Sequence, residues 1–272
     1  MSGEVSRTSV SADGSRIAWT QQGEGPAIVM VGGVMSSRSR PQQPGLASAL
    51  SSHYRVLSYD RRGTGESRTE QPYSVEREFE DLNCMLGLVG PGASVYGFSS
   101  GATLALLAAD AGVGGSQLLL IEPPLVSDPD LGPLEEAERR LHTDRATARE
   151  WFDVEITGIP AEIRAQFSPL TDEDIENAST MLHELRFLPG TTARQFAALR
   201  TPALLMASDH TAPNLLDWAR ELGDALPDVD LRILPGQWHG IADDVIVETI
   251  DDFLESRTTS RTAGRTTPQA TR

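Results

Sequence analysis

Hydrophobic and polar positions form two kinds of pattern along this chain: short apolar runs and longer amphipathic stretches. The short runs are rich in Val, Ile, Leu and Tyr, and they predict strands at residues 16–20, 27–31, 54–59, 94–98, 117–121, 203–207 and 230–234. Helical periodicity predicts helices at residues 45–50, 75–88, 100–111, 214–226 and 241–254. This alternation is typical of a mostly parallel sheet covered on both faces, so we expect an α/β fold. The first two strands have no helix between them and are expected to form an antiparallel hairpin at one edge.

One segment departs from this alternation because it contains no convincing strand. Between residues 123 and 198 the apolar positions follow helical spacing, and Thr171 to Asp174 resembles a capping box. We therefore expect a helical insertion at 123–198 between two parts of a core, 1–122 and 199–255. The three acids from Asp172 to Asp174 fit the first turn of a helix better than a metal site. Residues 256–272 lack an apolar pattern and are expected to form a disordered tail.

Composition bounds the class of protein and its partners. A chain of 272 residues with 39% hydrophobic and 23% charged residues fits a soluble globular protein. No secretory signal is visible and no apolar run approaches the roughly 18 residues that span a bilayer, so we expect a cytoplasmic location. The formal net charge of −16 argues against nucleic acid or an anionic membrane as a partner.

The reactive residue types that are absent narrow the chemistry further. All 23 basic residues are arginine, which removes Schiff-base chemistry, a pyridoxal phosphate anchor and a P-loop lysine. Cys84 is the only cysteine, so neither an internal disulfide nor a cysteine-based metal cluster is possible. We expect a small-molecule substrate, and the pattern carries no information about the oligomeric state.

The most informative motif is Gly97-Phe98-Ser99-Ser100-Gly101, which joins a predicted strand to a predicted helix. A serine at such a turn adopts a strained backbone, and glycines two residues before and after it let strand and helix approach closely. Ser99 has glycine at both positions, whereas Ser100 does not. The motif therefore predicts a nucleophile elbow at Ser99.

A serine nucleophile needs a base within hydrogen-bond reach and a third group that orients the base. When an elbow lies at the end of an α/β sheet, the three groups follow one another in the order Ser, Asp or Glu, His. Asp209 and His210 follow the strand predicted at 203–207, and His239 follows the one at 230–234. Glu122 also lies just past a strand end and stays open as an alternative acid.

These features together resemble the α/β-hydrolase family over nearly the whole chain, with the helical insertion similar to that family's cap. The turn from Val31 to Val34 resembles the family's oxyanion loop, and residues 59–67 closely match its D-x-R-G-x-G-x-S loop. One departure is visible, because Gly32-Gly33 stands where relatives often have His-Gly. The Asp60, Arg61 and Arg62 side chains are interpreted as a network that braces the loop.

The resemblance implies a role for each residue of the site. Ser99 would be the nucleophile, His239 the base and then the acid, and Asp209 the residue that orients His239. The backbone N–H groups of Val34 and Ser100 would form the oxyanion hole. Apolar neighbours are expected to line the substrate pocket, namely Met35, Phe98 and Trp238.

The leading hypothesis is hydrolysis of an ester, thioester or lactone of a small, mainly apolar molecule through an acyl-enzyme, without a cofactor or metal. The same fold also serves lyases, C–C bond hydrolases and cofactor-free haloperoxidases, because sites rather than folds determine chemistry. A ligand-binding protein with a slow triad is a third hypothesis. The sequence does not identify the substrate, since the cap shapes the pocket.

Overall fold

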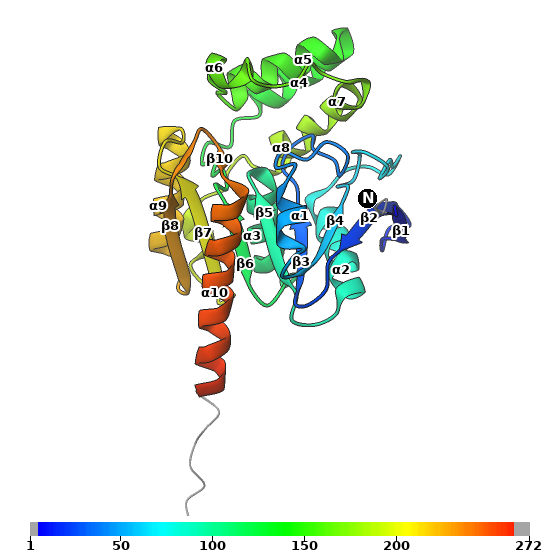
Figure 1. The fold of residues 1–272 in the computed structure, drawn as a ribbon. Helices are drawn as coiled ribbons and strands as arrows, with labels where there is room; N and C mark the ends of the chain where they lie inside the picture. Colours follow the sequence, from blue (N-terminus) through cyan, green and yellow to red (C-terminus); the bar gives the residue numbers. More distant parts are fainter. Residues whose placement is uncertain (1–4, 264–272) are drawn as a thin grey trace, which may run out of the picture.

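The computed structural model describes residues 5–263, and its centre is an eight-stranded sheet with the order β1-β2-β4-β3-β5-β6-β7-β8 (Figure 1). From β4 to β8 the neighbouring strands are parallel, and β2 and β1 add antiparallel partners at one edge. The strands are β1 (Arg7–Val10), β2 (Arg16–Gln22), β3 (Ala27–Val31), β4 (Arg55–Tyr59), β5 (Ser94–Phe98), β6 (Leu118–Ile121), β7 (Ala203–Ser208) and β8 (Val229–Leu234). The α/β fold expected from the alternating pattern is confirmed.

The hairpin predicted for the first two strands is wrong. β4 lies between β2 and β3 in the sheet, and β2 pairs with β4 and with β1 instead. The connection from β2 to β3 passes close to the end of the loop before β4, where a Cβ on Gly23 would lie 2.2 Å from the Tyr54 carbonyl oxygen. Gly23 also has a φ of +71°, which favours glycine. The short strand β1 escaped prediction because its side chains are mostly exposed and carry no apolar alternation.

Helices cover both faces of the sheet and enclose two apolar cores. One core contains residues of α2 (Val75–Val89), α3 (Ser100–Asp110) and α9 (Pro213–Ala225). The other contains residues of α1 (Leu46–Leu50) and α10 (Asp243–Ala263). The central strand β5 is buried at every position, as expected for a parallel strand covered from both sides. Its carboxyl end is therefore held in a fixed position.

The insertion between β6 and β7 forms a layer of helices above the carboxyl ends of the strands (Figure 1). It contains α4 (Gly132–Thr143), α5 (Arg145–Trp151), α6 (Ala161–Arg164), α7 (Asp172–Asn177) and α8 (Met181–Phe187), with a π-helical turn (Phe152–Ile156) and 3₁₀ turns (Ala178–Thr180, Ala193–Phe196). We call this layer the cap. The capping box predicted at Thr171 and Asp174 is present at the start of α7. A small apolar cluster joins the cap to the core through Met35, which packs with cap residues such as Phe152 and Met181.

The carboxyl-terminal part of the chain corrects another expectation. The tail predicted to be disordered from residue 256 is helical as far as Ala263, because α10 continues past its apolar face. Arg257 stabilises this continuation, since its guanidinium pairs with Asp228 at 2.6 Å and lies 5.1 Å from the Phe253 ring centroid. Residues 264–272 of that predicted tail lie outside the described residues.

Candidate active site

Ser99 occupies the sharp turn between β5 and α3, and its backbone has the form that the sequence predicts. Its φ and ψ are +54° and −127°, a conformation that L-residues rarely adopt. The two glycines are required by packing. A Cβ on Gly97 would lie 2.5 Å from the Ala102 Cα, and one on Gly101 would lie 2.4 Å from the Val31 carbonyl oxygen. The turn thus presents the Ser99 side chain at the carboxyl edge of the sheet.

His239 lies in the loop after β8, between the two-residue strands β9 (Gly236–Gln237) and β10 (Gly240–Ile241). Its ring contacts two aromatic side chains, with centroid distances of 4.7 Å to Phe98 and 5.2 Å to Trp238. The side chain is 13% exposed, and it lines the same cavity as Ser99. The structure therefore brings the predicted nucleophile and the predicted base to one site.

The carboxylate that contacts His239 is Glu122, directly after β6. Glu122 Oε2 forms a short hydrogen bond with His239 Nδ1 and also accepts from Thr211 Oγ1 at 2.9 Å. Its other oxygen, Oε1, accepts from the Ser208 backbone N–H at 2.7 Å. Glu122 is fully buried. Each of its oxygens is hydrogen-bonded, as a buried carboxylate requires.

Asp209, the expected orienting residue, does not reach His239. Its side chain is 42% exposed, and Oδ1 accepts from His210 Nδ1 at 2.8 Å and from the Gly236 N–H at 3.0 Å. The hydrogen bond with His210 lowers the pKa of the Asp209 carboxyl. Asp209 thus holds the turn after β8. The expectation for Asp209 is corrected in favour of Glu122, the alternative acid.

Strand order and side-chain direction together explain this correction. β6 is the direct neighbour of β5, with Phe98 opposite Ile121, so Glu122 stands next to Ser99 across the sheet. β7 is one strand further away, and its last residue, Ser208, is buried while Asp209 turns outward. The longer glutamate side chain bridges the remaining gap to the loop that carries His239. The chain order Ser, acid, His is kept with Glu122 as the acid.

Backbone strain concentrates at this site. Among the described residues, the non-glycine residues with positive φ are Met35, Ser99, Glu122 and His239, at +58°, +54°, +43° and +53°. Three of them are the candidate nucleophile, acid and base, and the fourth follows the predicted oxyanion residue. Such strain persists only where surrounding structure imposes it, and it clusters at functional sites. Its distribution supports a functional reading of this edge of the sheet.

The predicted oxyanion residues, Val34 and Ser100, line the same cavity as Ser99. Ser100 is the first residue of α3, so its N–H has no partner within the helix. The Val34 turn is held by Gln42, which accepts from the Gly33 N–H at 3.0 Å and donates to the Val34 carbonyl at 2.9 Å. Gln42 thus braces the loop in which glycine replaces the family's histidine, and no sequence signal singled it out.

A cavity of about 1120 Å³ opens above Ser99 between the core and the cap. Val34, Phe98 and Trp238 line it as expected, together with apolar cap residues such as Phe152 and Ile159. Charged side chains also line it, among them Arg149, Asp153 and Glu184 of the cap and Arg40 of the core. Met35, expected to be a pocket residue, is not among the lining residues, because its side chain is buried in the cluster that joins cap and core.

The D-x-R-G-x-G-x-S loop forms a buried network beside the site. Asp60 accepts from the backbone N–H groups of Arg38 and Glu66, at 2.7 and 2.9 Å. Arg62 pairs with Asp81 at 2.8 Å, and Arg61 is held between two carboxylates. These contacts confirm the bracing role predicted for the loop.

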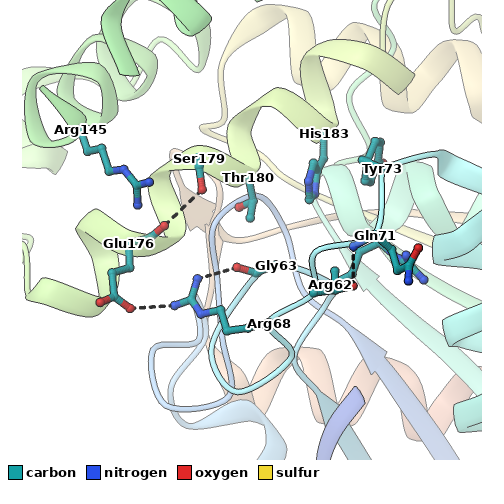
Figure 2. Close-up of a pocket in the computed structure, with 11 residues that line it drawn as sticks. Arg62, Gly63, Arg68, Gln71, Tyr73, Arg145, Glu176, Ser179, Thr180 and His183 are labelled. Atoms are coloured by element: carbon teal, nitrogen blue, oxygen red, sulfur yellow. Dashed lines mark hydrogen bonds and ion pairs between the residues drawn. The ribbon is translucent and has the colours of Figure 1, made fainter. Parts of the chain in front are cut away.

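A second cavity, of about 600 Å³, lies where the cap meets this loop (Figure 2). It shares no lining residue with the cavity above Ser99. Arg68 spans it, donating to the Gly63 carbonyl at 2.7 Å and pairing with Glu176 of the cap at 3.1 Å. His183 of the cap and Tyr73 of the core stack in it with ring centroids 3.8 Å apart. This cavity is therefore a seam that ties the cap to the core.

The buried side chain of His183 is expected to make the stability of the protein depend on pH. Burial lowers its pKa to about 4 from an ordinary 6.5, so the unfolded chain binds this proton more tightly than the folded protein. The part of the free energy of unfolding that depends on neutral His183 is fully present above pH 6.5 and is lost as the pH falls through 4. We expect a loss of about 3 kcal/mol, at roughly 1.4 kcal/mol per pKa unit. His183→Phe keeps the stacked ring without the titration, so urea unfolding of both proteins above pH 6.5 and near pH 4 measures the difference.

The comparison with the variant removes the contribution of other groups. Asp81, for example, has its pKa raised by burial to about 6 and acts with the opposite sign. An equal loss of stability in His183→Phe would contradict the assignment to His183.

The site contains a serine on a strand-to-helix turn, a histidine in the loop after β8 and a buried acid hydrogen-bonded to that histidine, under a helical cap. This chain matches the family model described as the alpha/beta hydrolase family over residues 28–251, and it belongs to that family. A solved alpha/beta hydrolase from Sphaerobacter thermophilus is 33% identical to it, with a TM-score of 0.79 over 91% of this chain and 100% of the other.

Two further comparisons extend this relationship. The solved enol-lactonase from Burkholderia xenovorans is 21% identical, with a TM-score of 0.67 over 92% of this chain and 100% of its own, a likeness of fold. A probable oxidoreductase named EphD from Mycobacterium tuberculosis is 32% identical over 98 residues. The match covers 34% of this chain and spans only 16% of that relative's length.

No helix within residues 5–263 has the length and apolar character needed to cross a membrane. In the same part of the chain, no three His, Cys, Asp or Glu side chains are grouped so as to hold a metal ion.

Proposed function

We propose that this protein is a serine hydrolase that cleaves an ester, thioester or lactone through a covalent acyl-enzyme. The observation that carries the proposal is the hydrogen bond that His239 Nδ1 shares with buried Glu122, at the edge of the sheet where Ser99 occupies the strained elbow. With Nδ1 facing the carboxylate, His239 has Nε2 left to accept the serine proton. This arrangement is the one that activates a serine hydroxyl at neutral pH.

In the proposed first step, Ser99 Oγ attacks the substrate carbonyl carbon while its proton moves to His239 Nε2. The negative charge that develops on the carbonyl oxygen is stabilised by the N–H groups of Val34 and Ser100. The tetrahedral species collapses, and the leaving group takes the proton from His239. Water then repeats the sequence on the acyl-enzyme and releases the acid. Glu122 orients His239 and stabilises its charged form throughout.

The cavity supports a mainly apolar acyl group. Its lining near the serine includes Val34, Phe98 and Trp238, and the cap adds further apolar side chains. The family membership supports hydrolysis in general, and the serine at the elbow favours the ester type over an aspartate-dependent reaction.

A fluorophosphonate tests the proposal directly, because only an activated serine reacts with it rapidly. We expect one adduct on the wild-type protein by intact mass, and no adduct on folded Ser99→Ala. Absence of an adduct on folded wild-type protein would contradict the proposal and favour a non-hydrolytic or ligand-binding role.

A further inference from the structure

Glu184 is a buried cap carboxylate that the proposed mechanism does not use. It lies on α8 and is 1% exposed, yet it lines the cavity that contains Ser99 and His239. Its Oε1 accepts from Arg61 Nη1 at 2.7 Å and from Ser100 Oγ at 3.2 Å. Its Oε2 has no hydrogen-bond partner among the described residues. One oxygen of this carboxylate is thus held in place while the other is free.

The charge around Glu184 is not fully balanced. Arg61 also forms two hydrogen bonds to Glu78, at 3.1 and 2.6 Å, so one guanidinium serves two buried carboxylates. Burial raises the pKa of Glu184, whereas Arg61 holds the pKa of Glu78 below its usual value against the effect of burial. Burying a polar atom without a hydrogen-bond partner costs free energy. A ligand group that forms a hydrogen bond to this oxygen is therefore bound favourably.

A hydroxyl group is the complement that fits both forms of this carboxyl group. It donates to Oε2 when Glu184 is ionised, and it accepts from Oε2 when Glu184 is protonated. A substrate carboxylate would be repelled by the ionised form, and an alkyl group would leave Oε2 unsatisfied. The position of Glu184 also suits this role. Its carboxylate accepts from Ser100, the residue that directly follows the candidate nucleophile Ser99.

We propose that Glu184 is a specificity-determining residue that binds a hydroxyl group of the substrate, so that the preferred substrates are hydroxylated esters or lactones with the hydroxyl close to the scissile carbonyl. This inference rests on the proposed hydrolase function and narrows it. The hydrocarbon part of the acyl group still contacts apolar side chains, and its hydroxyl binds Glu184 of the cap.

The test compares ethyl butyrate with ethyl 2-hydroxybutyrate and ethyl 3-hydroxybutyrate by pH-stat assay. We expect wild-type kcat/KM to be about tenfold or more higher for one hydroxy ester than for the plain ester. Glu184→Met removes both oxygens, and its ratio should fall to about one. Glu184→Gln keeps the contact with Arg61 and offers only an NH₂ donor at the second position, so its ratio should lie between those of the wild type and Glu184→Met. Glu138→Met, which changes an exposed cap glutamate, is the matched control and should keep the ratio.

The outcomes separate this inference from the hydrolase proposal. Fluorophosphonate labelling and hydrolysis of both ester types without a hydroxyl preference would overturn the role of Glu184 and indicate that water completes Oε2. Equal ratios in the wild type and in the Glu184 variants would overturn it too. If the wild-type protein is neither labelled by the fluorophosphonate nor hydrolyses any ester, the hydrolase function itself is refuted. If Glu184→Met does not fold by circular dichroism, the ratio in Glu184→Gln decides.

Discussion

Replacing Ser99 by alanine is expected to lower kcat for a nitrophenyl ester by about 10⁶-fold, leaving only the catalysis that binding and the oxyanion groups provide. The reason is that the other hydroxyl of the elbow, on Ser100, donates to Glu184 and is not the candidate nucleophile. Alanine and serine both carry a Cβ at the same positive φ, so the substitution adds no new backbone strain. Steady-state kinetics of the two proteins, with thermal unfolding to establish folding, measures the effect.

A surface serine supplies the control for this experiment. Ser48 lies on α1, away from the cavity, and Ser48→Ala should keep wild-type kinetics. Turnover by Ser99→Ala that approaches the wild-type rate would show that a different group carries the reaction. A binding protein with a vestigial triad would show no turnover in either protein.

Glu122→Gln is expected to lower kcat/KM by about 10⁴-fold, the scale observed when an orienting acid becomes an amide in a related triad. The amide oxygen can still accept from the Ser208 N–H, so the fold of the strand end is retained. The amide NH₂ would then face His239 Nδ1 and impose the tautomer whose Nε2 already carries a proton. That histidine cannot accept the proton of Ser99, so the attacking oxygen is not activated.

Asp209→Asn is the matched test of the acid assignment. Its side chain is 42% exposed and its oxygen holds the Gly236 N–H, a bond that asparagine can keep. We expect activity within about twofold of wild type and a stability change within about 0.5 kcal/mol. A large loss of activity in Asp209→Asn together with an active Glu122→Gln would reverse the assignment.

The different outcomes for these two acids show how far sequence reasoning reached. Both residues follow a predicted strand, both precede the histidine in the chain, and the strand pattern does not say which strand end lies nearer to His239. Sheet order alone does not favour Glu122, because β7 borders β8, whose loop carries His239. Side-chain direction decides, since Asp209 turns outward while Glu122 is buried and bonds to His239. These directions depend on tertiary packing that no local pattern records.

A similar limit explains the missed cap and loop contacts. Gln42 lies in a segment without a motif, and its contacts depend on how the loop after β3 folds back on itself. Glu184 meets the site only because the cap returns to it from a distant position in the chain. The misplacement of Met35 is of another kind, since an apolar residue next to the oxyanion loop fits either a pocket or a core. Packing against Phe152 and Met181 of the cap settled that choice.

The sequence by itself determined the α/β class, most strand and helix positions, the helical insertion and the elbow at Ser99. These features follow from periodicity and from glycines within a few residues, which are local properties of the chain. Only the tertiary structure decided which carboxylate meets His239, how the cap encloses the cavity, and that Glu184 lines it with one carboxylate oxygen that has no hydrogen-bond partner among the described residues. Such features depend on contacts between residues up to more than one hundred positions apart, as between Glu122 and His239, and those contacts exist only once the sheet and the cap have assembled.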